Sequence, residues 1–94
     1  MTYEPKPLST KNIKIPDHVE KNLEKIARNI HETWSKQRIQ EGWTFGPERS
    51  DSKKEHPGLV PYSQLSEAEK RYDRTTVEET IKSLILLGYK IEKN

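Results

Sequence analysis

The segment between Pro16 and Gly42 carries one apolar stripe at helical spacing. At about 100° per residue, the five members of the stripe fall within roughly 80° of one another, which is typical of a helix that buries one face. Proline suits a first helical turn and glycine the position just after a last one, so the pattern predicts a helix from about residue 16 to residue 40. The stripe consists of Val19, Leu23, Ile26, Ile30 and Trp34.

A second helical region follows residue 65. The patterns Ser66-x-x-Glu69 and Thr76-x-x-Glu79 are both capping boxes, in which a hydroxyl and a carboxylate satisfy free backbone N–H groups of a first turn. They predict a short helix that ends near residue 72 and a second helix that ends at Gly88. The buried face expected for the second helix contains Val77, Ile81, Leu84, Ile85 and Leu87.

The two ends of the chain have the patterns of extended segments. Prolines disfavour helical geometry in residues 1–15, so we expect an extended N-terminal lead that packs on a domain formed by residues 16–94. Ile13 and Ile15 alternate with a lysine, and so do Tyr89 and Ile91. Such alternation is typical of strands and predicts a short two-stranded pairing of the terminal segments.

The segment 42–64 is punctuated by three glycines and three prolines, and it also holds Trp43, Phe45 and Tyr62. Glycine and proline mark turns, whereas a merely solvated linker has no need of large apolar side chains. We therefore expect a long ordered aromatic-rich loop that packs on the helices. Loops of this length are commonly functional.

Apolar side chains are scarce in the chain as a whole. Leucine, isoleucine, valine and phenylalanine account for 19 of the 94 residues, while 34% of the residues are charged. The charges nearly cancel and leave a net charge of +2, so the composition favours a thinly cored globule over disorder. With the helical patterns, it predicts a mainly α fold, a small single domain of two to three packed helices.

Composition also excludes several classes of protein. The chain has no cysteine, and therefore no disulfide and no thiol nucleophile. No apolar run is long enough to cross a membrane, and the N-terminus lacks the pattern of a signal peptide, so we expect a cytoplasmic protein. The small net charge argues against nucleic acid as a partner.

The sequence offers no pattern for catalysis or for metal binding. The histidines His18, His31 and His56 are far apart, and Ser35 stands where a zinc-protease helix would place its second histidine. Neither a phosphate-binding glycine loop nor a nucleophile elbow is present. We therefore expect a protein that is not an enzyme and that has no metal and no cofactor.

Three side chains lie at the shoulder of the first helix's apolar stripe, where half-exposed residues occur: His31, Trp34 and Arg38. Arg38 follows Trp34 by four residues, so its guanidinium can stack on the indole. Two interpretations stay open. The group is either a core edge with an arginine packed over it, or a platform that stacks on a flat ligand and binds its phosphate or carboxylate.

The loop adds a second indole and further positive charge beside this platform. In a chain so poor in aliphatic residues, Trp43 and Phe45 are expected to be part of the core. Charged residues such as Arg49, Lys53 and Lys54 are commonly exposed on the surface without a binding role. Their clustering with aromatic side chains leaves a binding site as the second interpretation.

Together these motifs resemble the ryanodine receptor repeat, or RyR domain. The matching segments keep the order and spacing of that family and cover nearly the whole chain. They are Tyr3-x-Pro5-x-Pro7, residues 31–46 (HETWSKQRIQEGWTFG), residues 56–65 (HPGLVPYSQL), Tyr72-Asp73, residues 80–84 (TIKSL) and residues 87–89 (LGY). We expect a single-repeat, stand-alone protein of prokaryotic type.

The resemblance implies a non-catalytic cytosolic module that binds a nucleotide or a nucleotide-derived signal. In the calcium-release channels of the family, adenine nucleotides bind through the tryptophan that matches Trp34 and through nearby basic residues. The ligand-binding residues expected here are Trp34, Arg38, Arg49, His31, Trp43 and Tyr62. The alternative is a protein-interaction or scaffold module with no small ligand, since tryptophan, tyrosine and arginine are favoured at interfaces.

The channels carry the repeat in pairs, whereas this chain holds one. If the ligand lies between paired repeats, a second copy has to complete the site. We therefore expect a homodimer whose two-fold symmetry brings the two Trp34 side chains to a shared cleft.

Overall fold

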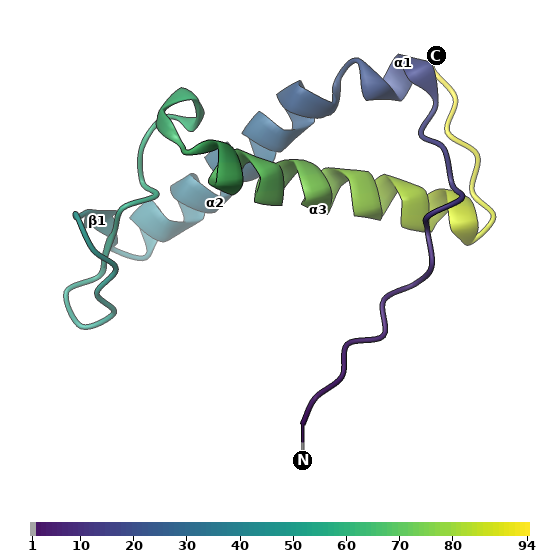
Figure 1. Cartoon of the computed structure of the whole chain (residues 1–94). Helices are drawn as coiled ribbons and strands as arrows, with labels where there is room; N and C mark the ends of the chain where they lie inside the picture. The colour runs from purple at the N-terminus through teal and green to yellow at the C-terminus, as the bar shows by residue number, and fades with distance from the viewer. Residues whose placement is uncertain (1) are drawn as a thin grey trace.

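The computed structural model describes residues 2–94 and is built around two long helices that cross (Figure 1). Helix α2 spans Leu23–Gln40 and helix α3 spans Glu67–Leu86. A short helix, α1 (Asp17–Glu20), precedes α2. Between α2 and α3 lie the strands β1 (Thr44–Phe45) and β2 (Glu55–His56) and the 3-10 helix η1 (Tyr62–Gln64). The prediction of a small, mainly α single domain is confirmed.

The first predicted helix is interrupted near its start, between α1 and α2. Asn22 leaves helical geometry there, with φ −106° and ψ 2°, and its side-chain amide donates to the His18 carbonyl oxygen at 3.4 Å. The predicted end near residue 40 is confirmed. Gly42 adopts φ +95°, and the Trp43 N–H donates to the Arg38 carbonyl oxygen at 3.0 Å. This left-handed residue suits glycine and turns the chain away from α2.

The region after residue 65 forms one helix, α3, and not the two expected. The first capping box is present, because the Ser66 hydroxyl accepts from the Glu69 N–H at 3.2 Å and Glu69 accepts from the Ser66 N–H at 3.3 Å. The prediction of a second capping box at Thr76 is wrong. Thr76 lies inside the helix, where its hydroxyl donates back to the Tyr72 carbonyl oxygen at 2.9 Å. The helical region does stop before Gly88, whose φ is +101°.

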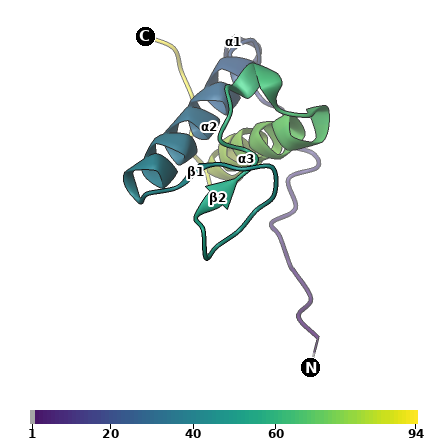
Figure 2. The same ribbon diagram turned by 90° about the vertical axis from the view of Figure 1, so that its left-hand side faces the viewer.

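The expected pairing of the terminal segments is also wrong. The two-stranded sheet is formed by β1 and β2, which run parallel just beyond the end of α2 (Figure 2). In the N-terminal segment, a turn joins the Ile13 N–H to the Thr10 carbonyl oxygen at 3.0 Å. After α3, the Tyr89 N–H donates to the Leu84 carbonyl oxygen at 3.0 Å. The backbone N–H groups of Ile13 and Tyr89 therefore form hydrogen bonds within local turns and are not available for pairing between strands.

The core lies between α2 and α3. Ala27 is completely buried, and Leu23 is the one buried member of the stripe predicted for the first helix, the other four being half-buried. On α3, Val77 is buried. The buried cluster consists of Ile15, Leu23, Ala27, Tyr62, Leu65 and Val77.

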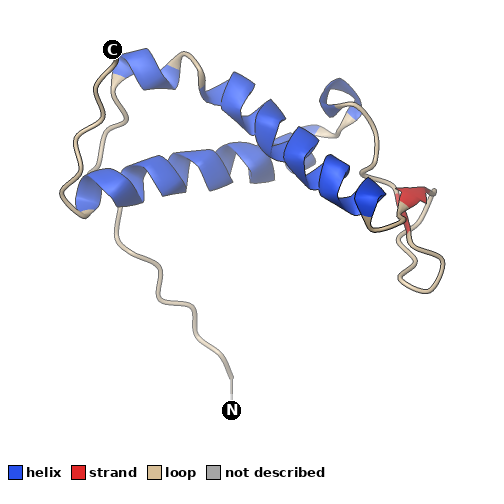
Figure 3. Ribbon diagram, turned by 180° about the vertical axis from the view of Figure 1, so that it is seen from behind, coloured by secondary structure: helices blue, strands red, loops and turns tan. Residues whose placement is uncertain are grey.

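A polar contact at Thr10 anchors the N-terminal segment to α3. Residues 2–9 are exposed and extend away from the helices (Figure 3). The Thr10 hydroxyl donates to Glu79 Oε2 at 2.6 Å, and Ile15 then joins the core. Within the described part of the chain, no helix has the length and apolarity that a membrane span requires.

Candidate functional site

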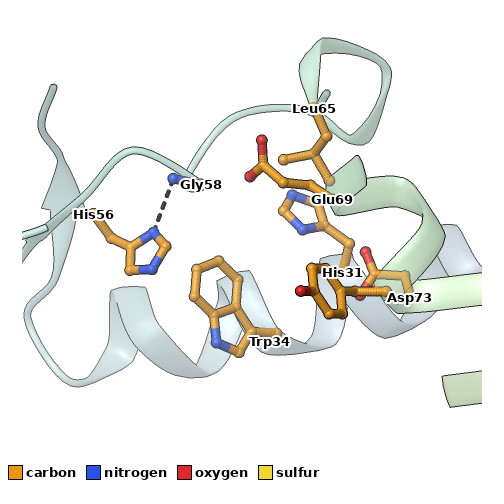
Figure 4. A pocket seen from close by; sticks show the side chains of 8 residues that line it. His31, Trp34, His56, Gly58, Leu65, Glu69 and Asp73 are labelled. Atoms are coloured by element: carbon orange, nitrogen blue, oxygen red, sulfur yellow. Dashed lines mark hydrogen bonds between the residues drawn. The ribbon is translucent and has the colours of Figure 1, made fainter. Parts of the chain in front are cut away.

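One cavity of about 220 Å³ lies between α2, α3 and the segment that leads from β2 to η1 (Figure 4). Helix α2 contributes two ring side chains, the connecting segment contributes a histidine and a glycine, and α3 contributes two carboxylates. The lining residues are His31, Trp34, His56, Gly58, Leu65, Glu69, Tyr72 and Asp73. Flat side chains and ionisable groups therefore meet in one concave place, as they do in binding sites.

His31 fastens α2 to the segment between β2 and η1. It lies one turn after Ala27 and continues the buried side of the helix, with 5% of its surface exposed. Its ring Nε2 donates to the Val60 carbonyl oxygen at 2.7 Å, and the Ser35 hydroxyl lies 3.4 Å from the same nitrogen. Because Nε2 carries the proton in this arrangement, Nδ1 of the neutral ring is left as an acceptor.

Trp34 stands between the two histidines of the cavity (Figure 4). Its ring centre is 5.8 Å from that of His31 at an interplanar angle of 28°, and 4.9 Å from that of His56 at 72°. The Arg38 guanidinium carbon lies 5.8 Å from the centre of this indole and 5.1 Å from that of Trp43. The arginine–indole stacking that the four-residue spacing predicts is therefore present.

His56, at the end of β2, is held by a close backbone contact. The Gly58 N–H donates to His56 Nδ1 at 2.8 Å, so the proton of the neutral ring is on Nε2. A β-carbon at position 58 would lie 3.0 Å from that Nδ1 and 3.5 Å from Trp34, which explains why glycine is needed there. Burial, and then the positive charges of Arg49 and Arg38, lower the pKa of His56 below its ordinary 6.5. The ring is therefore neutral near physiological pH.

Helix α3 supplies an acidic end to the cavity. Glu69 and Asp73 lie one turn apart on the same face as Tyr72. Oε1 of Glu69 also accepts from the Ser66 hydroxyl at 2.8 Å, so the first capping box fixes the position of this carboxylate. Burial, and then the charge of Glu69, raise the pKa of Asp73 above its ordinary 3.8, while His31 opposes this rise.

Two arginines lie beside the opposite end, near His56, and outside the lining. Arg38 pairs with Glu41 at 3.8 Å, and Arg49 pairs with Asp51 at 3.0 Å. Both are close enough to His56 to lower its pKa. Carboxylates therefore line the α3 end of the cavity, and two ion-paired arginines lie beside the β2 end, where the charges of Glu69 and Asp51 oppose their effect on His56.

Trp43 and Tyr62 lie behind the cavity and not in its lining. They are 8% and 4% exposed, and their rings are 6.4 Å and 6.1 Å from those of His56 and His31, respectively. The Tyr62 hydroxyl donates to Glu24 Oε1 at 2.8 Å. These two aromatic side chains therefore support the two lining histidines.

Of the six residues expected to bind a ligand, the structure brings His31 and Trp34 into the cavity wall. Sequence reasoning assigned no binding role to the α3 wall, because its carboxylates resemble an ordinary solvated helix face. A signal was present in the spacing, since Glu69, Tyr72 and Asp73 stand three and four residues apart and share one face. His56 belongs to the loop cluster and to the matching segment 56–65, but it is not among the six residues expected to bind a ligand.

The groups that line the cavity can recognise a flat ligand. Ring faces can stack on a flat ligand, carboxylate oxygens accept hydrogen bonds at one end, and ring N–H groups donate at the other. Among residues 2–94, no group of three or more histidine and carboxylate side chains could hold a metal ion.

Two crossed helices with a small ring-lined cavity between them define a small helical module. The chain belongs to the RyR domain family, because the family model described as RyR domain matches residues 3–93. The resemblance predicted from the tryptophan, glycine and proline motifs is therefore confirmed.

Proposed function

We propose that this RyR domain is a non-catalytic module that binds a nucleotide or a nucleotide-derived signal. The base lies in the cavity between α2 and α3 and stacks on Trp34, while the phosphate lies outside it, near Arg38 and Arg49. The observation that carries the proposal is a ring-lined cavity with carboxylates in its α3 wall and two arginines beside its β2 end.

The size of the cavity supports a single flat ring system as its occupant. Pockets for drug-sized ligands usually measure about 300–1,000 Å³, and this cavity measures about 220 Å³. A base fits such a volume, and the sugar and phosphate then extend through the mouth. Stacking of a base on an aromatic side chain contributes about 1–3 kcal/mol, so Trp34 is the main anchor.

The charges decide which end receives the phosphate. Glu69 and Asp73 repel an anion, so the phosphate has to leave the cavity on the arginine side. Arg38 and Arg49 already pair with carboxylates, but these pairs are at least partly exposed to water. Such pairs contribute at most about 1 kcal/mol, so exchanging a carboxylate for a phosphate costs little.

We also propose that two copies associate in solution. Tyr72 borders the mouth of the cavity and is 77% exposed, so a bound base is only partly covered within one chain. A second copy related by two-fold symmetry covers both mouths with one patch. Size-exclusion chromatography with light scattering is expected to show a dimer, and a monomer at every concentration, with and without nucleotide, would overturn this part.

A second candidate function is the docking of a protein partner. Four apolar side chains at the end of α3 are exposed and favour it: Leu84, Leu86, Leu87 and Tyr89. A thermal-shift screen separates the two functions, because a ligand that binds only the native state raises the unfolding midpoint. No shift with any nucleotide, together with a partner that depends on these leucines, would favour docking.

The direct test of nucleotide binding is the substitution Trp34→Ala. Calorimetry with the nucleotide that binds wild type best is expected to show an affinity about 5 to 150 times lower, given the stacking contribution of about 1–3 kcal/mol. Tyr89→Ala is the matched control, because Tyr89 is 63% exposed and lies outside the cavity. Circular dichroism checks that both variants fold. Equal affinities of Trp34→Ala and wild type would remove Trp34 from the site.

A further inference from the structure

The acidic end of the cavity lies on its α3 wall and offers acceptors. In neutral His31, Nε2 is bonded to Val60 and Nδ1 is an acceptor. Glu69 and Asp73 are carboxylates that accept only, when ionised. No hydrogen bond contributes to the environment of Asp73, whereas Glu69 is engaged with Ser66. The Asp73 carboxylate is therefore the free acceptor pair at this end of the cavity.

A base that enters with its edge toward Asp73 has to bring donors. Guanine presents two adjacent donors on its Watson–Crick edge, N1–H and the exocyclic N2 amine, which match the two oxygens of one carboxylate. Adenine presents its N6 amine beside N1, which is an acceptor and faces a carboxylate oxygen unfavourably. A buried acceptor that meets another acceptor loses its hydrogen bond and keeps its desolvation cost.

We propose that the cavity selects guanine over adenine, and that Asp73 is the residue that determines this specificity. The inference rests on the proposed function, because it assumes that the base lies in the cavity between α2 and α3. The walls are consistent with either purine, since Trp34, His31 and Tyr72 contact ring faces and edges without regard to their donors. Discrimination between guanine and adenine therefore depends on the Asp73 carboxylate at the α3 end of the cavity.

Calorimetry with four mononucleotides tests the inference. GMP, IMP, XMP and AMP share a purine ring and a phosphate and differ in the edge toward Asp73. IMP keeps N1–H without the amine, and XMP carries a carbonyl in its place. GMP is expected to bind about 10 to 100 times more tightly than AMP, because a bidentate pair discriminates bases by about that factor, with IMP between them.

The variant Asp73→Asn turns one acceptor into a donor and keeps the side-chain size. It is expected to lose at least about tenfold in GMP affinity and to gain affinity for XMP, whose carbonyl accepts from the new amide. A purely structural role of Asp73 would weaken all four nucleotides equally. Glu78→Gln is the matched control, since it removes one negative charge from α3 outside the cavity lining.

The outcomes separate this inference from the proposed function. Equal or tighter binding of AMP than of GMP by wild type would overturn guanine selection and leave nucleotide binding standing. A uniform loss in Asp73→Asn would overturn the role of Asp73. If wild type binds none of the four mononucleotides, the inference fails, and if no nucleotide raises the unfolding midpoint in the thermal-shift screen either, the proposed function fails with it.

Discussion

His56 shows how neighbouring charges set the state of a single side chain in the cavity. Its Nδ1 accepts from the Gly58 N–H, and burial and then two arginines oppose its protonation by lowering its pKa. The neutral ring keeps an Nε2–H donor. Protonation would compete with the geometry that Gly58 fixes, so the arginines help to keep the cavity wall in place.

The substitution Arg49→Gln is expected to raise the pKa of His56 toward its ordinary 6.5. The reason is that a positive charge nearby disfavours a second positive charge, and the substitution removes it. Burial and Arg38 still lower the pKa of His56 in this variant, while Glu69 and Asp51 raise it. An NMR titration of the His56 ring protons measures the shift.

Lys53→Gln serves as the control for this titration, because it removes a charge from the same loop that is not among the causes of the His56 shift. Its His56 titration should match that of wild type. A His56 pKa at or above 6.5 in the wild-type protein, or one that Arg49→Gln leaves unchanged, would contradict the prediction.

At the scale of single residues, helical periodicity could place His31 and Trp34 beside the apolar stripe of α2, although His31 is buried and not half-exposed as expected. It could not determine whether Trp43 and Tyr62 belong to the core or to the binding site. Their burial depends on how the segment 42–64 folds over α2, and no local periodicity encodes that path. Asp73 was missed for a related reason, since its role depends on which face of α3 meets α2.

At the scale of elements, the helix periods and the first capping box could be read from the sequence, whereas the sheet could not. Strands β1 and β2 have two residues each, which is too short for alternation to be detected. Their pairing also needs Lys54 at φ +54°, an uncommon geometry for a residue with a side chain. Thr76 was misread because a threonine inside a helix and a threonine at its start give the same pattern.

The substitutions Ser66→Ala and Thr76→Ala separate the real capping box from the false one. Ser66→Ala is expected to destabilise the protein by about 1 kcal/mol, because it leaves backbone N–H groups at the start of α3 without a partner. Thr76→Ala should change stability by less, or increase it, because alanine favours helix interiors by up to about 0.7 kcal/mol. Urea unfolding followed by circular dichroism measures both values.

These two variants control each other, since each removes one hydroxyl from the same helix. A loss in Thr76→Ala as large as that in Ser66→Ala would mean that residue 76 begins a separate helix in solution. That result would contradict the continuous α3.

At the scale of the whole molecule, the chain is more open than its length requires. Its radius of gyration is 16.2 Å, against roughly 12 Å for a compact chain of this size. The exposed N-terminal segment and the crossed arrangement of α2 and α3 account for the difference. Polar links between elements therefore carry a larger share of the stability. Glu24 forms one of them, by accepting from Tyr62 and pairing with Arg74 at 3.5 Å.

This link predicts a loss of stability at alkaline pH. Burial, and then the hydrogen bond to Glu24, raise the pKa of Tyr62 from 10.0 to about 12. The folded state therefore keeps a proton that the unfolded chain has released. The corresponding stability is fully present below pH 10.0 and is lost as the pH rises from 10.0 toward about 12.

Urea unfolding at a series of pH values measures this loss, and the Tyr62→Phe variant should lack the part due to Tyr62. At neutral pH the same variant is less stable by about 1 kcal/mol, because it loses one hydrogen bond. Tyr3→Phe is the control, since Tyr3 is 83% exposed. An alkaline loss of equal size in wild type and Tyr62→Phe would show that other groups cause it.

The formation of the cavity also depends on the whole molecule. One wall holds His31 and the other holds Asp73, so the site exists only when α2 and α3 cross. Sequence reasoning can place each residue on its own helix, but the crossing depends on the buried cluster as a whole. Helical periodicity and the family resemblance both indicated Trp34, and the fold supplied the carboxylates that line the same cavity.

The crossing of α2 and α3 also has a consequence for the time at which the protein can fold in the cell. The central contact joins Ala27 to residues near Val77, which are 50 residues further along the chain. At about 5–20 residues per second, a ribosome needs roughly 3–10 s to make that stretch. For those seconds the apolar side of α2 lacks the α3 side chains that complete the buried cluster. The nascent chain can therefore bind chaperones or other nascent chains before α3 packs on α2 and forms the cavity.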